Sequence, residues 1–349
     1  MSNWTAADVP DLTGKTVVVT GANSGLGYEA TSVLARNGAT VVMACRSAER
    51  GERAAAEIRE FELREARTPS KSSGRSPRAA AEDAALDVRE CDLADLESVE
   101  SFADEVLADY DELHVLCNNA GVMAVPRSET ADGFEMQFGV NHLGHFALTA
   151  HLVERIVETP GETRVVTHSS GAHQGGEIDF DDLHHEESYG KWEAYGQSKL
   201  ANLLFAYELQ RRLDAAGVED TVSAACHPGY ADTGLQARGP QQEGSALKLY
   251  AMRAANAVFA QSAERGALPL LYAATAPDVT GGEYVGPGGL FDMRGYPEPQ
   301  RSSDASYDAD AADRLWSVSE EQTDVTYDFD AVAETAAGDV SSDAASAAE

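Results

Sequence analysis

An α/β fold, with a doubly wound parallel sheet and helices on both faces, is the architecture that this sequence predicts. Short runs rich in β-branched residues alternate with longer stretches of helical periodicity. Several of the short runs are apolar on both faces, which is typical of parallel strands covered by helices on each side. A glycine-rich segment directly follows the first run. Strand, helix and strand in this order predict right-handed crossovers and one sheet.

Six apolar runs are expected as strands, and a shorter strand is expected late in the chain. The strand ranges are Lys15–Thr20, Ala39–Ala44, Leu86–Cys91, Leu113–Asn118, Arg164–His168 and Thr221–Cys226, and the late strand is Glu283–Val285. The expected helices are Leu26–Asn37, Ala48–Arg64, Leu96–Tyr110, Phe134–Glu158 and Ala194–Ala215.

The chain of 349 residues is expected to form a single domain over residues 1–322. The Ser/Pro/Gly-rich stretch 68–78 is expected as an inserted surface loop. The stretch 245–260 is a candidate amphipathic helix, interpreted as a substrate lid. Residues 323–349 are acidic and poor in large apolar groups, so a disordered tail is expected there.

The charge balance is the most unusual feature of the composition. With 26 basic and 59 acidic residues the formal net charge is −33. Such a surface repels phosphate, which argues against nucleic acids and anionic membranes as partners.

An acidic, lysine-poor surface on an ordinary core is similar to the surfaces of proteins from halophiles. A generic acidic protein is the alternative. Without a long apolar run or signal peptide, we expect no membrane span and a cytoplasmic location. The four cysteines read as buried free thiols.

The glycine-rich segment after the first strand is a candidate dinucleotide site of the Rossmann type. It reads TGANSGLG, and a helix is expected to follow. Glycines with this spacing allow a tight turn, and the N-terminus of the helix favours a pyrophosphate. A glycine-rich turn without a ligand is the alternative. The candidate cofactor-binding residues in this segment are Gly21, Asn23, Ser24, Gly25, Leu26 and Gly27.

The ends of the next strands add further candidate cofactor contacts. Arg46 stands where NAD-specific sites usually place an acid, so a 2′-phosphate and hence NADP are expected. Asp92, followed by Leu93, could accept a hydrogen bond from the adenine amino group. An exposed arginine and a helix-start acid are the respective alternatives. The cofactor ribose would lie against the sheet at the end of the fourth expected strand. The candidate cofactor-binding residues there are small or polar: Asn118, Ala120 and Gly121.

Tyr195 and Lys199 are the candidate acid/base pair. They are four residues apart on an expected helix and therefore share one face. A neighbouring ammonium is expected to lower the pKa of the phenol toward a useful range. A surface Tyr/Lys pair is the alternative when this pair is taken alone.

Taken together, these motifs resemble the short-chain dehydrogenase/reductase family from about Leu12 to Gln322. The motifs, in order, are TGANSGLG, CDL, NNAG, Asn141 in VNHLGHF, Ser169-Ser170, YGQSK and HPGYADT. MACR, SKLAN and the late DRLW are most similar to the retinol dehydrogenase-like and WW-domain-oxidoreductase-like branch. Ser170 and Tyr195 are 25 residues apart, a longer spacing that this branch shares.

The resemblance implies a role for each matching residue. Tyr195 would be the general acid or base, and Lys199 would bind the nicotinamide ribose. Ser170 would position the substrate oxygen, with Ser169 as the fallback. Asn141 would hold a water that links Lys199 to solvent. Pro228, Gly229 and Thr233 would line the nicotinamide.

The expected activity is NADP(H)-dependent hydride transfer between the nicotinamide and a small-molecule carbonyl or alcohol. The branch suggests a lipophilic, retinal-like substrate. A dinucleotide-binding redox sensor or scaffold without turnover is the alternative, and a double-bond reductase is a third possible function.

No metal is expected, because His184 and His185 are interpreted as part of a solvated loop. His168 reads as a packed strand residue, and His142 and His145 as packing beside Asn141. For the oligomeric state, both a monomer and a homo-oligomer are compatible with the sequence.

Overall fold

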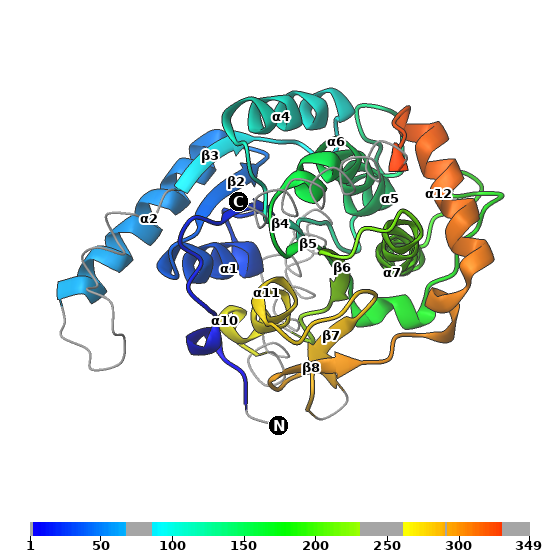
Figure 1. Cartoon of the computed structure of the whole chain (residues 1–349). Helices are drawn as coiled ribbons and strands as arrows, with labels where there is room; N and C mark the ends of the chain where they lie inside the picture. The colour runs from blue at the N-terminus through cyan, green and yellow to red at the C-terminus, as the bar shows by residue number, and fades with distance from the viewer. Residues whose placement is uncertain (1–2, 68–85, 231–260, 290–291, 330–349) are drawn as a thin grey trace, which may run out of the picture.

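Within the described residues, the protein is built around one eight-stranded sheet (Figure 1). The computed structural model describes residues 3–67, 86–230, 261–289 and 292–329. The strand order is β3-β2-β1-β4-β5-β6-β7-β8, with β1 to β7 parallel and β8 antiparallel to β7. The strands are β1 Thr16–Thr20, β2 Thr40–Cys45, β3 Leu86–Glu90, β4 Val115–Asn118, β5 Thr163–His168, β6 Thr221–Cys226, β7 Tyr284–Pro287 and β8 Pro297–Gln300.

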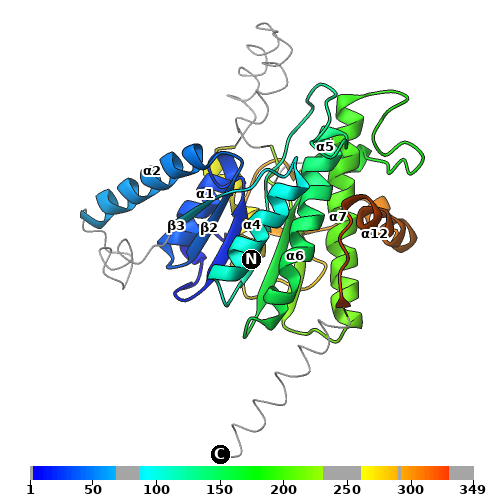
Figure 2. The ribbon, with the colours of Figure 1, turned by 90° about the horizontal axis from the view of Figure 1, so that it is seen from above.

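Helices cover both faces of the sheet, as the two-sided apolar strands predict (Figure 2). Val17 and Val19 of β1 belong to the core cluster under α1 Gly25–Arg36, α2 Ala48–Arg67 and α11 Leu268–Thr275. Val18 lies in the opposite cluster, under α4 Leu96–Asp109, α6 Gly144–Glu158 and α7 Lys191–Ala215. Successive side chains of a strand point to opposite faces, so an all-apolar strand needs cover on both.

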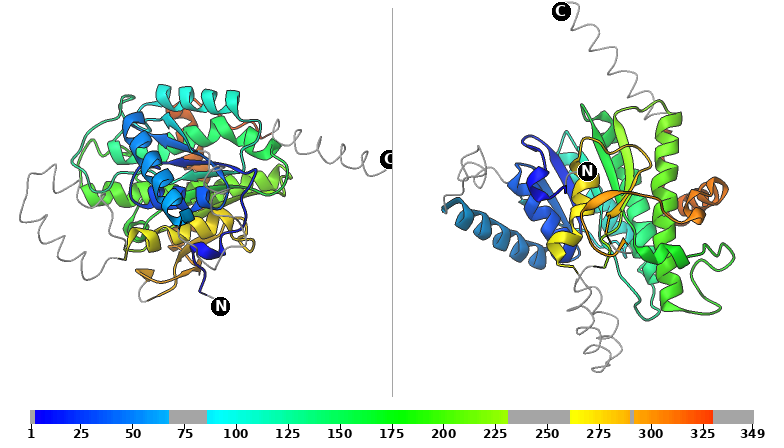
Figure 3. Two further views of the ribbon diagram at one scale, coloured as in Figure 1. Left: turned by 90° about the vertical axis from the view of Figure 1, so that its left-hand side faces the viewer. Right: turned by 90° about the horizontal axis from the view of Figure 1, so that it is seen from below.

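Within the described residues, three α-helices and one strand have no counterpart among the expected elements. They are α10 Ala263–Gly266, α11, α12 Ala309–Thr323 and β8. Strand β8 contains two prolines, which an edge strand tolerates because its outward N–H groups have no partner to lose. On the α11 side, Trp4 packs edge-on against Tyr272 at 5.3 Å, so the N-terminal segment lies beside this helix (Figure 3).

The expected single helix Phe134–Glu158 is divided in the structure. It consists of the short α5 Met136–Phe138, a π-helical segment Gly139–Leu143 and α6. Gly144 lies so close to the β3–α4 connection that a Cβ there would be 2.5 Å from the Leu93 oxygen. The widened turn places the Asn141 side chain toward the end of β4.

The ordered domain extends beyond the expected boundary at residue 322. After α12, Asp324 adopts a left-handed conformation (φ 54°) and the chain turns back. Tyr327 is 8% exposed, and its hydroxyl donates to the Phe146 main-chain oxygen at 2.7 Å. Its ring lies 4.5 Å from that of Trp316. The expectation of a tail from residue 323 is therefore corrected for residues 323–329.

Several sequence expectations fall outside the described residues. These are the loop 68–78, the lid 245–260, the cofactor residue Thr233 and positions 330–349. In the part of the chain that the structure describes, no helix combines the length and apolarity needed to span a bilayer. All four cysteines are buried free thiols, as expected.

Candidate functional site

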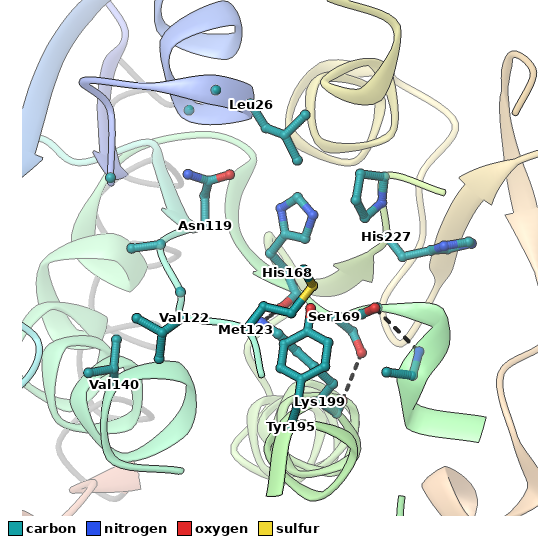
Figure 4. Close-up of a pocket in the computed structure, with 18 of the residues that line it drawn as sticks. Leu26, Asn119, Val122, Met123, Val140, His168, Ser169, Tyr195, Lys199 and His227 are labelled. Carbon is teal, nitrogen blue, oxygen red and sulfur yellow. Dashed lines mark hydrogen bonds between the residues drawn. The ribbon is translucent and has the colours of Figure 1, made fainter. Parts of the chain in front are cut away.

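A cavity of about 820 Å³ opens at the carboxyl ends of the central strands (Figure 4). It reaches from the glycine-rich turn after β1 across the ends of β4, β5 and β6 to Gln300 of β8. It lies where the strand order reverses between β1 and β4, which is where open α/β sheets bind their ligands.

The glycine-rich turn has the geometry of a phosphate cradle. Gly21 and Gly25 have φ values of 67° and 56°, which favour glycine. A Cβ on Gly27 would lie 2.4 Å from the Gly21 oxygen, so only glycine fits this close approach. Helix α1 begins at Gly25, and within the described part of the chain the side chain of its N-cap residue Ser24 makes no capping hydrogen bond. The first N–H groups of α1 therefore face the cavity without a side-chain cap, and they fit a pyrophosphate.

Two arginines line the end of the cavity beyond β2. Arg46 and Arg50 are both exposed, and no carboxylate in the described part of the chain pairs with either. This is unusual in a protein with 59 acids for 26 bases. Sequence reasoning missed Arg50, although its position four residues after Arg46 was a usable signal. Asp92 and Leu93 line the same end; one Asp92 oxygen accepts from the Ala94 N–H at 3.1 Å.

At the end of β4, the structure corrects one expected contact. The Asn118 side chain is fully buried and donates to the Thr149 hydroxyl at 2.9 Å, away from the cavity. Asn119 lines the cavity instead, and its amide donates to the Thr20 oxygen at 2.7 Å. Ala120 and Gly121 line the cavity as expected.

Tyr195 and Lys199 lie close together in the cavity (Figure 4), and Ser170 lines the same cavity. Tyr195 and Lys199 lie one turn apart on α7, and both are buried. The Lys199 Nζ donates to the His168 main-chain oxygen at 3.0 Å and lies 6.0 Å from the centre of the Tyr195 ring. The Ser170 side chain hydrogen-bonds Tyr195. Ser169 instead donates to the Lys199 main-chain oxygen at 2.7 Å, so Ser170 is the serine that faces the phenol.

The protonation of this pair differs from the expectation. Burial raises the pKa of Tyr195 above its ordinary value, and the hydrogen bond with Ser170 opposes that rise. Burial lowers the pKa of Lys199 to about 8. The expected lowering of the phenol pKa is therefore corrected: at neutral pH the geometry favours a neutral phenol beside an ammonium that is held by the sheet.

Asn141 lies directly behind this centre. Its amide donates to the Val122 oxygen and to the Ser198 hydroxyl, each at 2.9 Å, and its Oδ1 accepts from the Val122 N–H at 2.8 Å. The side chain thus fixes the β4 connection against α7. Its role in holding a water stays a prediction.

The histidines near the site differ in their surroundings. His142 and His145 are buried and hydrogen-bond Ser319 and Thr20, so they pack as expected. His168 is also buried, but its ring lines the cavity between Leu26 and Ser169 (Figure 4). Among the described residues its Nδ1 has no hydrogen-bond partner, and burial, together with the nearby Lys199, lowers the pKa of His168 to about 3. His184 stacks on Phe134 with ring centres 5.5 Å apart, so it is partly packed rather than solvated.

Pro228 and Gly229 line the cavity on the β6 side. Gly229 has φ 64°, and a Cβ there would lie 2.5 Å from the Met293 oxygen. Met123 and Trp192 also line the cavity. Neither was named as a candidate site residue, and only the fold brings their two segments to the same cavity.

Comparison with known proteins identifies the family. The family model for short chain dehydrogenases matches residues 15–69 and 66–244. The chain is 41% identical to retinol dehydrogenase 14 of Mus musculus over 309 residues, covering 88% of this chain and 85% of the relative. It is 39% identical to retinol dehydrogenase 13 of Homo sapiens over 311 residues, covering 88% and 84%.

Solved structures agree with this assignment. The crystal structure of an uncharacterised protein from Mycobacterium Paratuberculosis is 42% identical and superposes with a TM-score of 0.72, over 93% of this chain and 99% of that one. The crystal structure of a putative NAD(P) dependent gluconate 5-dehydrogenase from Beutenbergia cavernae, with NADP bound at low occupancy, is 25% identical and superposes with a TM-score of 0.55, over 78% of this chain and 95% of that one. The chain therefore belongs to the short-chain dehydrogenase family, an oxidoreductase family, in its retinol dehydrogenase-like branch.

Proposed function

We propose that this protein is an NADP(H)-dependent carbonyl reductase or alcohol dehydrogenase that acts on a lipophilic substrate. The observation that carries the proposal is the meeting of Tyr195, Ser170 and Lys199 in a cavity that also contains a glycine cradle for phosphate. The family is one of nicotinamide-dependent oxidoreductases, and the residues present fit such a cofactor.

The three central side chains divide the proton chemistry between them. The bound cofactor supplies or accepts the hydride. In reduction, the neutral Tyr195 hydroxyl gives its proton to the carbonyl oxygen as that oxygen gains negative charge. Ser170, hydrogen-bonded to Tyr195, donates to the same oxygen and orients it. Lys199 places a positive charge beside the resulting phenolate and stabilises it until a proton returns.

Choice of NADP over NAD rests on Arg46 and Arg50. Both guanidinium groups line the cavity beyond β2 without a carboxylate partner in the described chain. A guanidinium forms strong, bidentate hydrogen bonds with a phosphate group. The pair would therefore hold the 2′-phosphate that distinguishes NADP.

The lipophilic character of the substrate rests on the cavity mouth. Four large hydrophobic side chains are well exposed in the described part of the chain, and two of them, Trp192 (58%) and Met293 (39%), line the cavity. Exposed apolar side chains gathered at one cavity mark a binding surface. On so acidic a protein they favour an apolar substrate over a charged one.

The test is NADPH consumption with a panel of aldehydes and ketones, together with Tyr195→Phe. Phenylalanine keeps the ring but has no proton to give, so turnover should fall on the order of 10²–10⁴-fold while NADPH still binds. Ser317→Ala, on the exposed side of α12, is a matched control for loss of one hydroxyl far from the cavity. Cofactor binding without turnover of any substrate would favour a redox sensor or scaffold instead.

A further inference from the structure

Two segments that lie far apart in the sequence form one part of the cavity wall. The first is Met123–Val125, which follows β4, and the second is Tyr189–Trp192, which leads into α7. Met123, Ala124, Lys191 and Trp192 line the cavity. Ala124 has φ 48°, a conformation that a residue with a Cβ adopts only when its surroundings fix it.

One fully buried side chain, Gln137 of α5, joins these two segments. Its Oε1 accepts from the Ala124 N–H at 2.7 Å. Its Nε2 donates to the Lys191 main-chain oxygen and to the Tyr189 hydroxyl, each at 2.9 Å. Both polar atoms of the Gln137 side chain therefore join one segment of the wall to the other.

Tyr189 and Glu135 complete the same network. The Tyr189 hydroxyl lies 2.9 Å from the Val125 oxygen and 3.2 Å from Glu135 Oε1. Glu135 is itself buried and accepts from the first N–H groups of α5, at 2.9 Å from Gln137 and 2.8 Å from Phe138. The carboxylate thus fixes α5, and α5 fixes Gln137.

The side chain that this network places is Trp192. It follows Lys191 directly, and its ring stands edge-on to that of Tyr195 with centres 6.1 Å apart and planes at 76°. It is 58% exposed, so one aromatic surface is free beside the proton donor. A flat aromatic surface at this distance can contact a group attached to the reacting carbonyl, and it stacks best on another flat apolar group.

We infer that Trp192 determines substrate specificity by contacting a flat apolar group next to the carbonyl, and that Gln137 is the residue that positions it. The inference rests on the proposed function and adds the substrate class: carbonyls with an aromatic or conjugated substituent over saturated ones of equal size. Gln137 touches no substrate and acts only through Trp192 and the wall.

The first experiment compares two aldehydes of similar size, benzaldehyde and cyclohexanecarbaldehyde. The ratio of their kcat/KM values should fall about 3- to 10-fold in Trp192→Leu, which keeps an apolar side chain but loses the flat surface. Trp192→Phe should retain most of the ratio. An unchanged ratio in Trp192→Leu would overturn the inference.

The second experiment tests the positioning role. Gln137→Glu keeps an acceptor for Ala124 but cannot donate to Tyr189 or Lys191, and Tyr189→Phe is the milder variant if it folds poorly. Each should raise KM for benzaldehyde more than it lowers kcat. If Gln137 acts through Trp192, the double variant Gln137→Glu/Trp192→Leu should change the ratio no more than Trp192→Leu alone.

Gln197→Glu is the matched control for a purely structural effect. Gln197 is also a buried glutamine that joins two segments, through the Asp179 N–H and the Leu183 oxygen, but it does not line the cavity. It should lower the melting temperature without changing the ratio. Additive effects of Gln137→Glu and Trp192→Leu, or an equal shift in Gln197→Glu, would refute the positioning role.

Binding without turnover separates this inference from the proposed function. Calorimetric titration of benzaldehyde into enzyme saturated with NADP⁺ forms a complex that cannot react. Its affinity should be about 3- to 10-fold weaker in Trp192→Leu. If the wild-type protein reduces no aldehyde but shows this difference, the proposed function fails and the Trp192 contact stands. If the wild-type protein reduces aldehydes but the two proteins bind benzaldehyde equally well, the proposed function stands and the Trp192 contact is refuted.

Discussion

Lys199 Nζ and the main-chain oxygen of His168 are 3.0 Å apart and joined by a hydrogen bond. Asn202 donates to the same oxygen at 2.9 Å, so the end of β5 fixes the ammonium from the sheet side. The ammonium is buried beneath the cavity, and its charge is not shared with a carboxylate in the described part of the chain. Keeping it there disfavours the folded state and favours a negative group in the cavity above.

We expect Lys199→Met to stabilise the protein at pH 7 and to lose that advantage at high pH. Burial lowers the pKa of Lys199 from 10.5 to about 8. Below pH 8 the lysine is charged in both states, and the folded state bears the cost of burial. Between about pH 8 and 10.5 the unfolded chain binds a proton that the folded one does not, so the wild type gains stability as pH rises.

Urea unfolding of both proteins at pH 7 and pH 10 measures this difference. Asn202 still satisfies the His168 oxygen in the variant, so no buried acceptor is left without a partner. NADPH affinity should fall in Lys199→Met if the lysine binds the nicotinamide ribose, as the family resemblance implies. A stability difference that does not change between the two pH values would contradict the prediction.

Arg46→Ala and Arg50→Ala should each reduce the preference for NADPH over NADH. A guanidinium–phosphate pair contributes a few kcal/mol at most, so the wild-type preference should be roughly ten- to several-hundred-fold. Binding titrations with both cofactors give the ratio. Arg53→Ala is the control. Arg53 lies on α2, as Arg50 does, but its guanidinium is 3.9 Å from the Glu49 carboxylate and it does not line the cavity. A preference equal to that of the wild type in the Arg46 variant would exclude this role.

Truncation after Thr323 should destabilise the protein strongly, whereas truncation after Phe329 keeps the contacts seen here. The first removes the Tyr327 ring from its place against Phe146 and Trp316. Loss of a buried aromatic side chain costs about 3–5 kcal/mol. It also removes the hydrogen bond to the Phe146 oxygen.

Tyr327→Phe separates the hydroxyl from the ring, and should cost only about 1 kcal/mol or somewhat more. Denaturant midpoints of the three proteins give the order. If the two truncated proteins unfold together, residues 324–329 contribute nothing to the fold.

Strands β1 and β2 could be predicted from the sequence because they are buried on both faces and therefore largely apolar. Strand β3 is only partly buried and contains Asp87, Arg89 and Glu90, so its prediction depended on the alternation of strands and helices along the chain. The last strand could not, since Pro297 and Pro299 in β8 resemble a loop until the antiparallel edge position is known. The division of Phe134–Glu158 also escaped prediction. The π-helical segment ends at Leu143, next to Gly144, which closely approaches Leu93, and such a contact between distant segments is not visible in a local pattern.

The site was predictable where one motif carries several residues and not where single residues converge. The pair Asn118 and Asn119 shows the limit: adjacent side chains point apart, and the strand end decides which one faces the cavity. Trp192 and Gln137 are different, because their placement follows from contacts between segments that are distant in the sequence.

The melting temperature should rise with KCl concentration well beyond 0.1 M. On α4, Glu97, Glu100 and Asp104 are exposed on one side of the helix, so like charges lie three and four residues apart and repel one another. With a net charge of −33, such repulsion acts across the whole surface until salt screens it. The Debye length falls from about 10 Å at 0.1 M to about 3 Å at 1 M, so screening alone is nearly complete there. A further rise between 1 and 2 M would indicate ion binding or exclusion at the carboxylates.

Glu100→Lys should raise the stability at 0.1 M by a few tenths of a kcal/mol and reduce the salt dependence. Scanning calorimetry of both proteins from 0.1 to 2 M KCl is the measurement, and a flat melting temperature for the wild type would refute the dependence on salt.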